Sequence, residues 1–277
     1  MKPLIINLAP TGMVPTRKDT PYVPLTPEEI IEDVCRCIPL GVSMVHLHAR
    51  DEDGIPTHRK EVSARIIEGI RTVNSEVIIV VTTSGRNIPE FEKRSEVLEL
   101  DGDCRPDMAS LTLSSLNFPK QASVNSPVII ESLVEKMLEK GILPEFEVFD
   151  LGMVNYANYL IQKKNIPAPY YFNILLGNVA SAQAKLFHLA TIMSEFPPDS
   201  ICSVAGIGNS QLVANCLGLV AADGVRTGLE DNLWMDDDRA VFSTNYGLVE
   251  RVCRIARELN RPIATPRQVR DMLKCYR

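Results

Sequence analysis

Two histidines separated by a single residue give the clearest chemical signal in this chain. His46 and His48 lie in the segment VHLHAR (residues 45–50), which ends a short apolar run typical of a buried β-strand. Residues two apart on a strand point to the same side, so both imidazoles are expected to face one way. Imidazole nitrogens are good ligands for zinc and related divalent metals. The alternative is a pair of hydrogen-bonded histidines in the core.

A third ligand for such a metal is offered near the other end of the chain. The segment GVRTGLED (residues 224–231) brings Arg226, Glu230 and Asp231 close together. Two histidines and a glutamate that leave one coordination position open are typical of a catalytic zinc site rather than a structural one. Asp231 is then a candidate general base, with Arg226 either holding it ionised or binding a carboxylate. The alternative is a solvated charge cluster in a loop.

The elements that must position these residues alternate between short apolar runs and longer amphipathic stretches. Most of the apolar runs are continuous, as expected for strands buried on both faces. The predicted strands are Leu4–Leu8, Met44–His48, Val77–Thr83, Met108–Leu113, Phe146–Asp150, Tyr170–Leu176, Ile201–Ala205 and Gly224–Thr227. Repeated right-handed β-α connections close most simply into a barrel, and an open doubly wound sheet is the competing fold. We therefore predict an α/β fold, a (β/α)8 TIM barrel that spans residues 1–277 as a single domain with one extra C-terminal helix.

Start and stop signals for the helices agree with this alternation. Thr26, Ser126 and Thr265 each precede a proline, which is the pattern of an N-cap followed by proline at the first helical position. The second of these signals predicts a helix that continues to residue 140. Gly41 and Gly141 stand where helices that precede strands are expected to end.

The composition is that of an ordinary globular protein and excludes several functional classes. The 277 residues are 45% hydrophobic and 23% charged, which argues against a disordered or fibrous chain. Lys and Arg number 29 against 35 Asp and Glu, and this net charge of −6 without any basic run argues against nucleic-acid binding. No segment has the ~18 apolar residues of a membrane span, and the first strand begins too early to leave room for a signal peptide. We expect a cytoplasmic protein whose seven cysteines are reduced.

Six segments, taken together, resemble the β-keto acid cleavage enzyme family. They follow in order along nearly the whole chain, and the second and the last are the most specific. The segments are NLAPTG (7–12), HLHARD (46–51), TTSG (82–85), MASL (108–111), PEFEVFD (144–150) and GVRTGLED (224–231).

The resemblance implies a zinc-containing barrel enzyme, an acyltransferase that exchanges acyl groups between a β-keto acid and acetyl-CoA. The products would be acetoacetate and a new acyl-CoA. The resemblance implies three metal ligands, which are His46, His48 and Glu230. It also implies that Asp231 removes a proton from C2 of the keto acid, assisted by Arg226 and by Glu147 on the fifth strand. A metal there would stabilise enolate charge as a Lewis acid. Members of the family resemble one another in forming tetramers, so a homotetramer is expected.

Hydroxyl side chains are expected to contact the substrate, because a barrel carries its chemistry at the carboxyl ends of its strands. Thr82, Ser84 and Ser110 lie at the ends of the third and fourth predicted strands. They are candidates to bind the substrate carboxylate or keto oxygen. The alternative is that each hydroxyl only caps a turn.

The loop after the seventh strand is a candidate anion site. It begins with Gly206 and contains Gly208 and Asn209, whose backbone amides are expected near acetyl-CoA, where they would bind a phosphate or a carboxylate. The alternative is an ordinary barrel turn.

One segment departs from the family pattern. In members that cleave an amino-substituted keto acid, a glutamate soon after the Thr-Gly of the first strand meets the ammonium group of the substrate. In this chain Met13 and Val14 follow that Thr-Gly, with no acid in the stretch that ends at Thr16. We therefore expect these two residues to line a pocket for a neutral or apolar tail.

Two other functions remain open from the sequence. Another metal-dependent barrel enzyme (a lyase, aldolase or hydrolase) would also use two histidines on one strand. Amidohydrolases typically add histidines on later strands, whereas this chain has four histidines in all and none in its later strands. An inactive metal-dependent ligand-binding protein would hold zinc without enolising a substrate or depending on acetyl-CoA.

Overall fold

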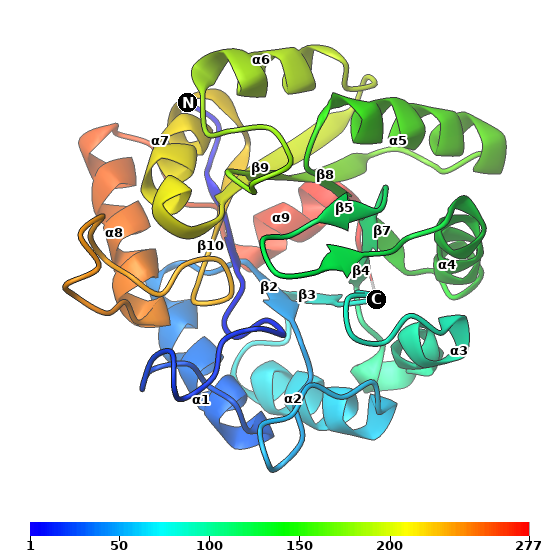
Figure 1. Cartoon of the computed structure of the whole chain (residues 1–277), viewed down its shortest axis with the longest axis horizontal. Helices are drawn as coiled ribbons and strands as arrows, with labels where there is room; N and C mark the ends of the chain where they lie inside the picture. Colours follow the sequence, from blue (N-terminus) through cyan, green and yellow to red (C-terminus); the bar gives the residue numbers. More distant parts are fainter. Residues whose placement is uncertain (277) are drawn as a thin grey trace.

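Eight parallel strands close into a barrel in the computed structural model, which describes residues 1–276 (Figure 1). Around the barrel the strands run in the order β1-β10-β9-β8-β7-β4-β3-β2, so the predicted TIM barrel is confirmed and the open sheet is wrong. The barrel strands are β1 (Ile5–Leu8), β2 (Met44–Leu47), β3 (Ile78–Val81), β4 (Met108–Thr112), β7 (Leu143–Val148), β8 (Tyr170–Leu176), β9 (Ser200–Gly206) and β10 (Gly224–Thr227).

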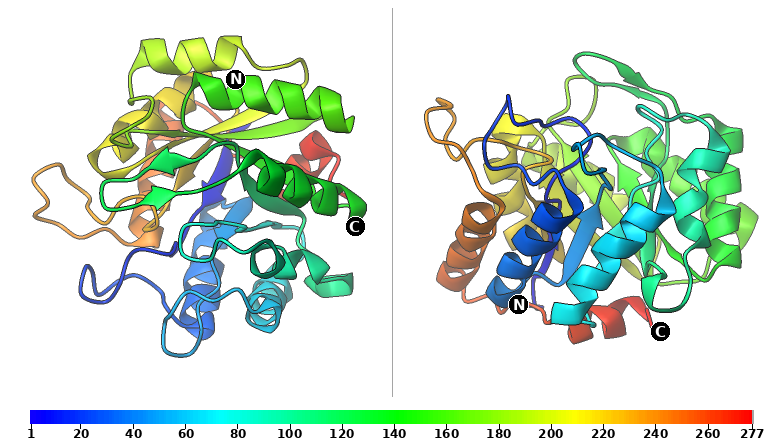
Figure 2. Two further views of the ribbon diagram at one scale, coloured as in Figure 1. Left: turned by 45° about the vertical axis from the view of Figure 1, so that its right-hand side comes forward. Right: turned by 90° about the horizontal axis from the view of Figure 1, so that it is seen from below.

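Helices surround the barrel, and one further helix crosses one of its ends (Figures 1 and 2). The outer helices are α1 (Pro27–Cys37), α2 (Lys60–Val73), α3 (Phe91–Arg94), α4 (Pro127–Glu139), α5 (Leu151–Lys164), α6 (Leu186–Ser194), α7 (Gln211–Ala221) and α8 (Asn245–Glu258). The closing helix is α9 (Pro266–Leu273). Short 3₁₀ turns are η1 (Ile38–Leu40), η2 (Glu96–Glu99), η3 (Gly102–Cys104) and η4 (Gly208–Ser210).

The predicted helix signals are confirmed. The side chains of Thr26, Ser126 and Thr265 each accept a hydrogen bond from a backbone N–H in the first turn of the helix that follows. Gly41 and Gly141 adopt positive φ angles of 114° and 66°, which a residue with a Cβ rarely adopts. These caps fix where the chain turns back to the barrel.

The fifth barrel strand differs from the prediction at both of its ends. It covers Leu143–Val148 rather than Phe146–Asp150, because Leu143 already pairs with Met108 of β4. Asp150 is not in the strand. Its carboxylate accepts a hydrogen bond from the backbone N–H of Met153 at 3.1 Å and so begins α5.

The amino-terminal end of the barrel is filled with apolar side chains and covered by α9. This layer comprises Ile5, Met44, Ile78, Val80, Met108 and Tyr171 with Ala264, Val269 and Leu273 from the C-terminal segment. Arg270 anchors α9 through two hydrogen bonds to the buried carboxylate of Asp107, at 2.9 and 3.1 Å. Chemistry is therefore confined to the opposite end of the barrel.

A short hairpin that the sequence did not predict lies over that opposite end (Figure 2). It is formed by the antiparallel strands β5 (Leu116–Asn117) and β6 (Ala122–Ser123), between β4 and α4. Within residues 1–276, no helix is both long and apolar enough to cross a membrane. No disulfide is formed among the cysteines of this part of the chain.

Candidate active site

A cavity of about 490 Å³ opens at the carboxyl ends of the strands, between the barrel and the β5–β6 hairpin. Most residues that the sequence singled out line it, and these are Met13, Val14, His46, His48, Thr82, Ser84, Glu147, Arg226, Glu230 and Asp231. Ser110, Gly206, Gly208 and Asn209 do not.

The three predicted metal ligands converge on the floor of this cavity. The Nε2 atoms of His46 and His48 are 3.3 Å apart, and His48 Nε2 lies 3.2 Å from Glu230 Oε1. One ligand atom from each of the three residues lies within 4.8 Å of the others. Glu230 Oε2 is buried and has no hydrogen-bond partner within residues 1–276. A divalent cation would satisfy this unpaired oxygen together with the two imidazoles, so the residues fit a metal.

Glu145, which the sequence analysis did not single out, orients the first of these histidines. It is completely buried, and its Oε2 lies 2.7 Å from His46 Nδ1. Its Oε1 accepts hydrogen bonds from the amides of Asn7 at 3.1 Å and Asn173 at 3.3 Å. A carboxylate on Nδ1 leaves Nε2 of the same ring to face the metal position. The signal was available in the sequence, because Glu145 and Glu147 are two residues apart on one strand and so share a face.

The pKa values of the two histidines are shifted in opposite directions. Burial lowers the pKa of His48. Burial also opposes the charged form of His46, but the Glu145 carboxylate outweighs it and raises the pKa of His46. The Glu145 carboxylate therefore favours positive charge at His46, which a bound metal ion would supply in place of a proton.

Arg226 gathers the acidic residues of the cavity. Its guanidinium is buried and donates to both carboxylate oxygens of Asp231, at 2.9 and 3.0 Å. It also donates to Glu230 Oε1 at 2.7 Å, and its Nη1 lies 3.6 Å from Glu147 Oε1. Arg226 thus holds the predicted metal ligand Glu230 close to the two candidate proton acceptors, Asp231 and Glu147.

The same contacts separate the acidic residues by pKa. Burial opposes ionisation of Glu230, but Arg226 and the two histidines outweigh it and hold the pKa of Glu230 well below its usual range. Burial raises the pKa values of Asp231 and Glu147 in spite of Arg226. Glu230 is therefore suited to bind a cation, whereas Asp231 and Glu147 are better placed to accept a proton.

The loop after β1 is shaped to let Glu230 reach the cavity. Gly12 has a φ of +64°, and a Cβ built on it would lie 2.5 Å from Glu230 Cγ. Arg50 clamps this loop, because its buried guanidinium donates to the carbonyls of Gly12 and Pro15. Gly12 and Arg50 thus help to position Glu230.

Ser110 is placed differently from the prediction. It is buried, it does not line the cavity, and its Oγ accepts a hydrogen bond from the backbone N–H of Thr83 at 3.1 Å. It joins the segment after β3 to β4 and does not reach the cavity wall. Thr112, two residues further along β4, reaches the cavity and donates to Glu147 Oε2 at 2.7 Å. The sequence analysis missed Thr112, although the same alternation along the strand points to it.

The glycine loop after β9 also requires a correction. Gly206, Gly208 and Asn209 do not line the cavity. The backbone N–H of Gly208 is already used, because it donates to the backbone carbonyl of Asp231 at 2.8 Å. Asn209 points elsewhere and donates to the carbonyl of Asp237. The loop holds the segment that carries Asp231, and it meets the cavity through Ile207 rather than through the three predicted residues.

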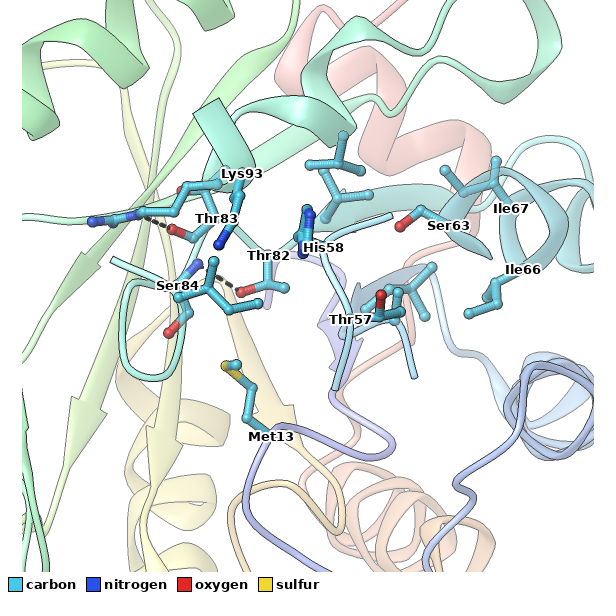
Figure 3. Close-up of a pocket in the computed structure, with 16 residues that line it drawn as sticks. Met13, Thr57, His58, Ser63, Ile66, Ile67, Thr82, Thr83, Ser84 and Lys93 are labelled. Atoms are coloured by element: carbon cyan, nitrogen blue, oxygen red, sulfur yellow. Dashed lines mark hydrogen bonds between the residues drawn. The ribbon is translucent and has the colours of Figure 1, made fainter. Parts of the chain in front are cut away.

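Thr82 and Ser84 both cap a turn and line the cavity. The backbone N–H of Ser84 donates to Thr82 Oγ1 at 3.1 Å. Figure 3 shows both residues and Met13 beside a second, smaller pocket of about 40 Å³, which extends toward His58 and α2. His58 lies there 3.5 Å from Glu96. That pocket has room for only a few water molecules.

Comparison with known proteins places this chain beside enzymes of similar sequence. The pattern of the family described as beta-keto acid cleavage enzyme matches residues 3–275. The chain is 37% identical over 274 residues to a 3-keto-5-aminohexanoate cleavage enzyme of Fusobacterium nucleatum, covering 99% of this chain and 98% of that one. It is 35% identical over 276 residues to a 3-oxoadipate:acetyl-CoA acetyltransferase of Cupriavidus necator, covering 98% and 95% of the two chains.

A solved structure supports the fold independently. The apo structure of ObcA superposes with a TM-score of 0.76 at 22% identity, covering 92% of this chain and 66% of ObcA. At that identity the likeness concerns the barrel alone. The match along nearly the whole sequence decides the family, and this chain is a member of the β-keto acid cleavage enzyme family.

Proposed function

We propose that this protein is a divalent-metal enzyme, with zinc as the metal, that exchanges the acyl group of a β-keto acid with acetyl-CoA. The products are acetoacetate and a new acyl-CoA. The observation that carries the proposal is the convergence of His46, His48 and Glu230 beside the Arg226–Asp231 ion pair on one cavity floor. The names of relatives that use acetyl-CoA support the choice of the second substrate.

His46, His48 and Glu230 would hold the metal, which supplies Lewis acidity toward the oxygens of the keto acid when it is bound. The chain itself contributes the proton acceptor. Asp231 takes a proton from C2 of the keto acid, and its raised pKa makes it a stronger base than an exposed aspartate. Arg226 holds both oxygens of that carboxylate and so fixes the direction of attack. Glu147, held by Thr112, is the second candidate acceptor.

The proposed reaction forms one carbon–carbon bond at C2 of the keto acid and breaks another. The C2 carbanion forms a bond to the carbonyl carbon of acetyl-CoA, and the thiolate of CoA leaves. The thiolate then attacks the former C3 carbonyl, and the C2–C3 bond breaks with its electron pair on C2. The proton first taken by Asp231 returns to C2, which yields acetoacetate and the acyl-CoA of the original tail. Thr82 and Ser84 are placed on the cavity wall to bind oxygens of the keto acid.

The test combines turnover with exchange. Purified protein loaded with zinc is incubated with a panel of β-keto acids and acetyl-CoA while acetoacetate is measured, and C2 deuterium exchange is followed with and without acetyl-CoA. Asp231→Asn should keep fold and metal yet lose exchange by on the order of 10²–10⁴-fold. Asp238→Asn, which changes an exposed acid of the same loop, is the matched control. If Asp231→Asn exchanges the C2 proton at a rate near that of the wild type, Asp231 is not the base and Glu147 becomes the candidate.

The wall of the cavity bears on the tail of the substrate. Met13 and Val14 lie on it as expected, and Arg86 and Lys120 also line it. Among the described residues, the acids on the wall are only those already gathered around Arg226. An ammonium-bearing tail would thus meet cations and no free acid. We expect kcat/KM for an uncharged tail to exceed that for 3-keto-5-aminohexanoate by about tenfold or more, because burying an unpaired charge is costly. Equal turnover of the two substrates would overturn this assignment.

We further propose a homotetramer located in the cytoplasm. Support for self-association comes from α6, where Leu186 and Phe187 are 64% and 79% exposed. Large exposed apolar side chains of this kind are common at protein–protein contacts. Analytical ultracentrifugation of the wild type and of Phe187→Ser tests the assembly, and a monomeric wild type would contradict it.

A further inference from the structure

Arg86 reaches into the cavity from the loop after β3 and is held there by an aromatic ring. Its guanidinium carbon lies 3.4 Å from the ring centroid of Phe118, which belongs to the hairpin over the cavity. Phe118 packs edge-on against Phe149, with centroids 5.9 Å apart. Stacking on an aromatic face orients a guanidinium while leaving its N–H groups available.

No carboxylate within residues 1–276 forms an ion pair with Arg86, and its guanidinium makes no hydrogen bond to these residues. Burial lowers the pKa of Arg86, while the carboxylates of Glu230, Glu147 and Asp231 counteract this effect. Those three acids are engaged by other partners. Arg226 binds Glu230 and Asp231, and Thr112 donates to Glu147. A half-buried cation with its donors unused gains most when an anion binds in the cavity.

The geometry also selects the kind of anion. Arg86 lines the same cavity as His46, His48 and Asp231, so an anion that it binds there lies close to the reacting atoms. The phosphates of CoA are separated from the thioester by the long pantetheine arm and do not meet this condition. The planar fork of a guanidinium matches the two oxygens of a carboxylate. We propose that Arg86 binds a carboxylate of the β-keto acid, an inference that rests on the proposed function.

Two carboxylates meet this description, and substrates distinguish them. Every β-keto acid carries a carboxylate at C1, whereas a dicarboxylic acid such as 3-oxoadipate carries a second one at the end of its tail. Arg86→Gln removes the charge and keeps a planar group that stacks on Phe118, and Arg86→Lys keeps the charge without the fork. Arg59→Gln, which removes an exposed arginine outside the cavity, is the matched control.

The measurement is kcat and KM for 3-oxohexanoate and 3-oxoadipate at saturating acetyl-CoA. Arg86→Gln should lower kcat/KM by about 10–100-fold, mainly through KM, because a hydrogen-bonded charge pair is lost. If kcat/KM falls with both substrates, Arg86 binds the C1 carboxylate. If it falls with 3-oxoadipate alone, Arg86 binds the carboxylate at the end of the tail. Arg86→Lys should recover part of the loss. Unchanged kinetics with both substrates, or an effect on the KM of acetyl-CoA alone, would overturn the proposal.

Binding of unreactive analogues separates this proposal from the proposed function. Calorimetry of the zinc-loaded protein with 3-hydroxyhexanoate and 3-hydroxyadipate needs no turnover. Weaker binding of either analogue by Arg86→Gln supports the carboxylate site even if the wild type cleaves no β-keto acid. Equal binding of both analogues by wild type and variant would refute the site even if the wild type is active.

Discussion

Replacement of Glu145 by glutamine should weaken the binding of metal although it replaces none of the three predicted ligands. Glutamine keeps the shape of the side chain but offers one acceptor and one donor in place of two acceptors. If its oxygen takes the place of Oε1, it keeps the hydrogen bonds to Asn7 and Asn173, but its NH₂ then faces His46 Nδ1. The proton of His46 must move to Nε2, which removes the lone pair that faces the metal.

The opposite orientation of the amide is also unfavourable. It keeps the proton on His46 Nδ1 but points the NH₂ at two amide donors, 3.1 and 3.3 Å from Glu145 Oε1. Rotating the amide of Asn7 or Asn173 by 180° does not relieve this clash. The Oδ1 atom of each has no partner within residues 1–276, so an NH₂ group rotated into its place would have no acceptor. Loss of such a partner typically weakens metal binding by about 10–100-fold, and a buried unsatisfied group costs about 1–3 kcal/mol of stability.

The assay is competition for zinc between protein and a chromophoric chelator, with thermal unfolding measured alongside. Tyr171→Phe is the matched control, because its hydroxyl bonds to Ser203 at 2.8 Å and accepts from Asn7 at 3.3 Å in the same buried network without contacting His46. This control should lose stability and keep its zinc affinity. Wild-type zinc affinity in a folded Glu145→Gln protein would refute the reasoning about the tautomer.

Three further predictions concern Gly12, Asp231 and Arg270. Gly12→Ala should displace Glu230 and lower the zinc content, because its Cβ would lie 2.5 Å from Glu230 Cγ. Gly102→Ala is the control: Gly102 also has a positive φ, but a Cβ there would have no neighbour within 4 Å, so this variant should keep its zinc. C2 exchange should fall as pH decreases through the pKa of Asp231, and this fall should lie above the ordinary aspartate value of 3.8, because burial raises that pKa and only the ionised form accepts a proton. Arg270→Met should reduce the free energy of unfolding by about 1–3 kcal/mol, because buried hydrogen bonds to Asp107 are lost while Arg71 stays 3.2 Å from that carboxylate. It should leave kcat unchanged, since α9 lies at the other end of the barrel.

Each of these has an outcome that contradicts it. Equal loss of zinc in both glycine variants would trace the effect of Gly12 to backbone strain alone. Exchange that stays constant down to the ordinary aspartate pKa would remove Asp231 as the base. Loss of kcat in a stable Arg270→Met protein would show that α9 affects the cavity.

The sequence by itself determined the features that depend on local periodicity. Successive side chains of a strand alternate between its faces, so the same-side placement of His46 and His48 follows from their spacing alone. The repeated order of strand and helix leads to a closed barrel because right-handed connections leave few other topologies. The caps at Thr26, Ser126 and Thr265 are equally local, and the structure has each of them.

Only the tertiary structure decided which residues meet. Glu145 contacts His46 across 99 positions of the chain, through barrel closure and strand register rather than any nearby motif. Ser110 and Thr112 share a face of β4, yet Ser110 bonds to Thr83 just after β3 and Thr112 reaches the cavity, because they stand at different heights in the barrel. Arg86 is an ordinary loop arginine until the hairpin brings Phe118 against it. Spacing along a chain fixes direction, whereas contact between distant segments depends on how the whole barrel closes.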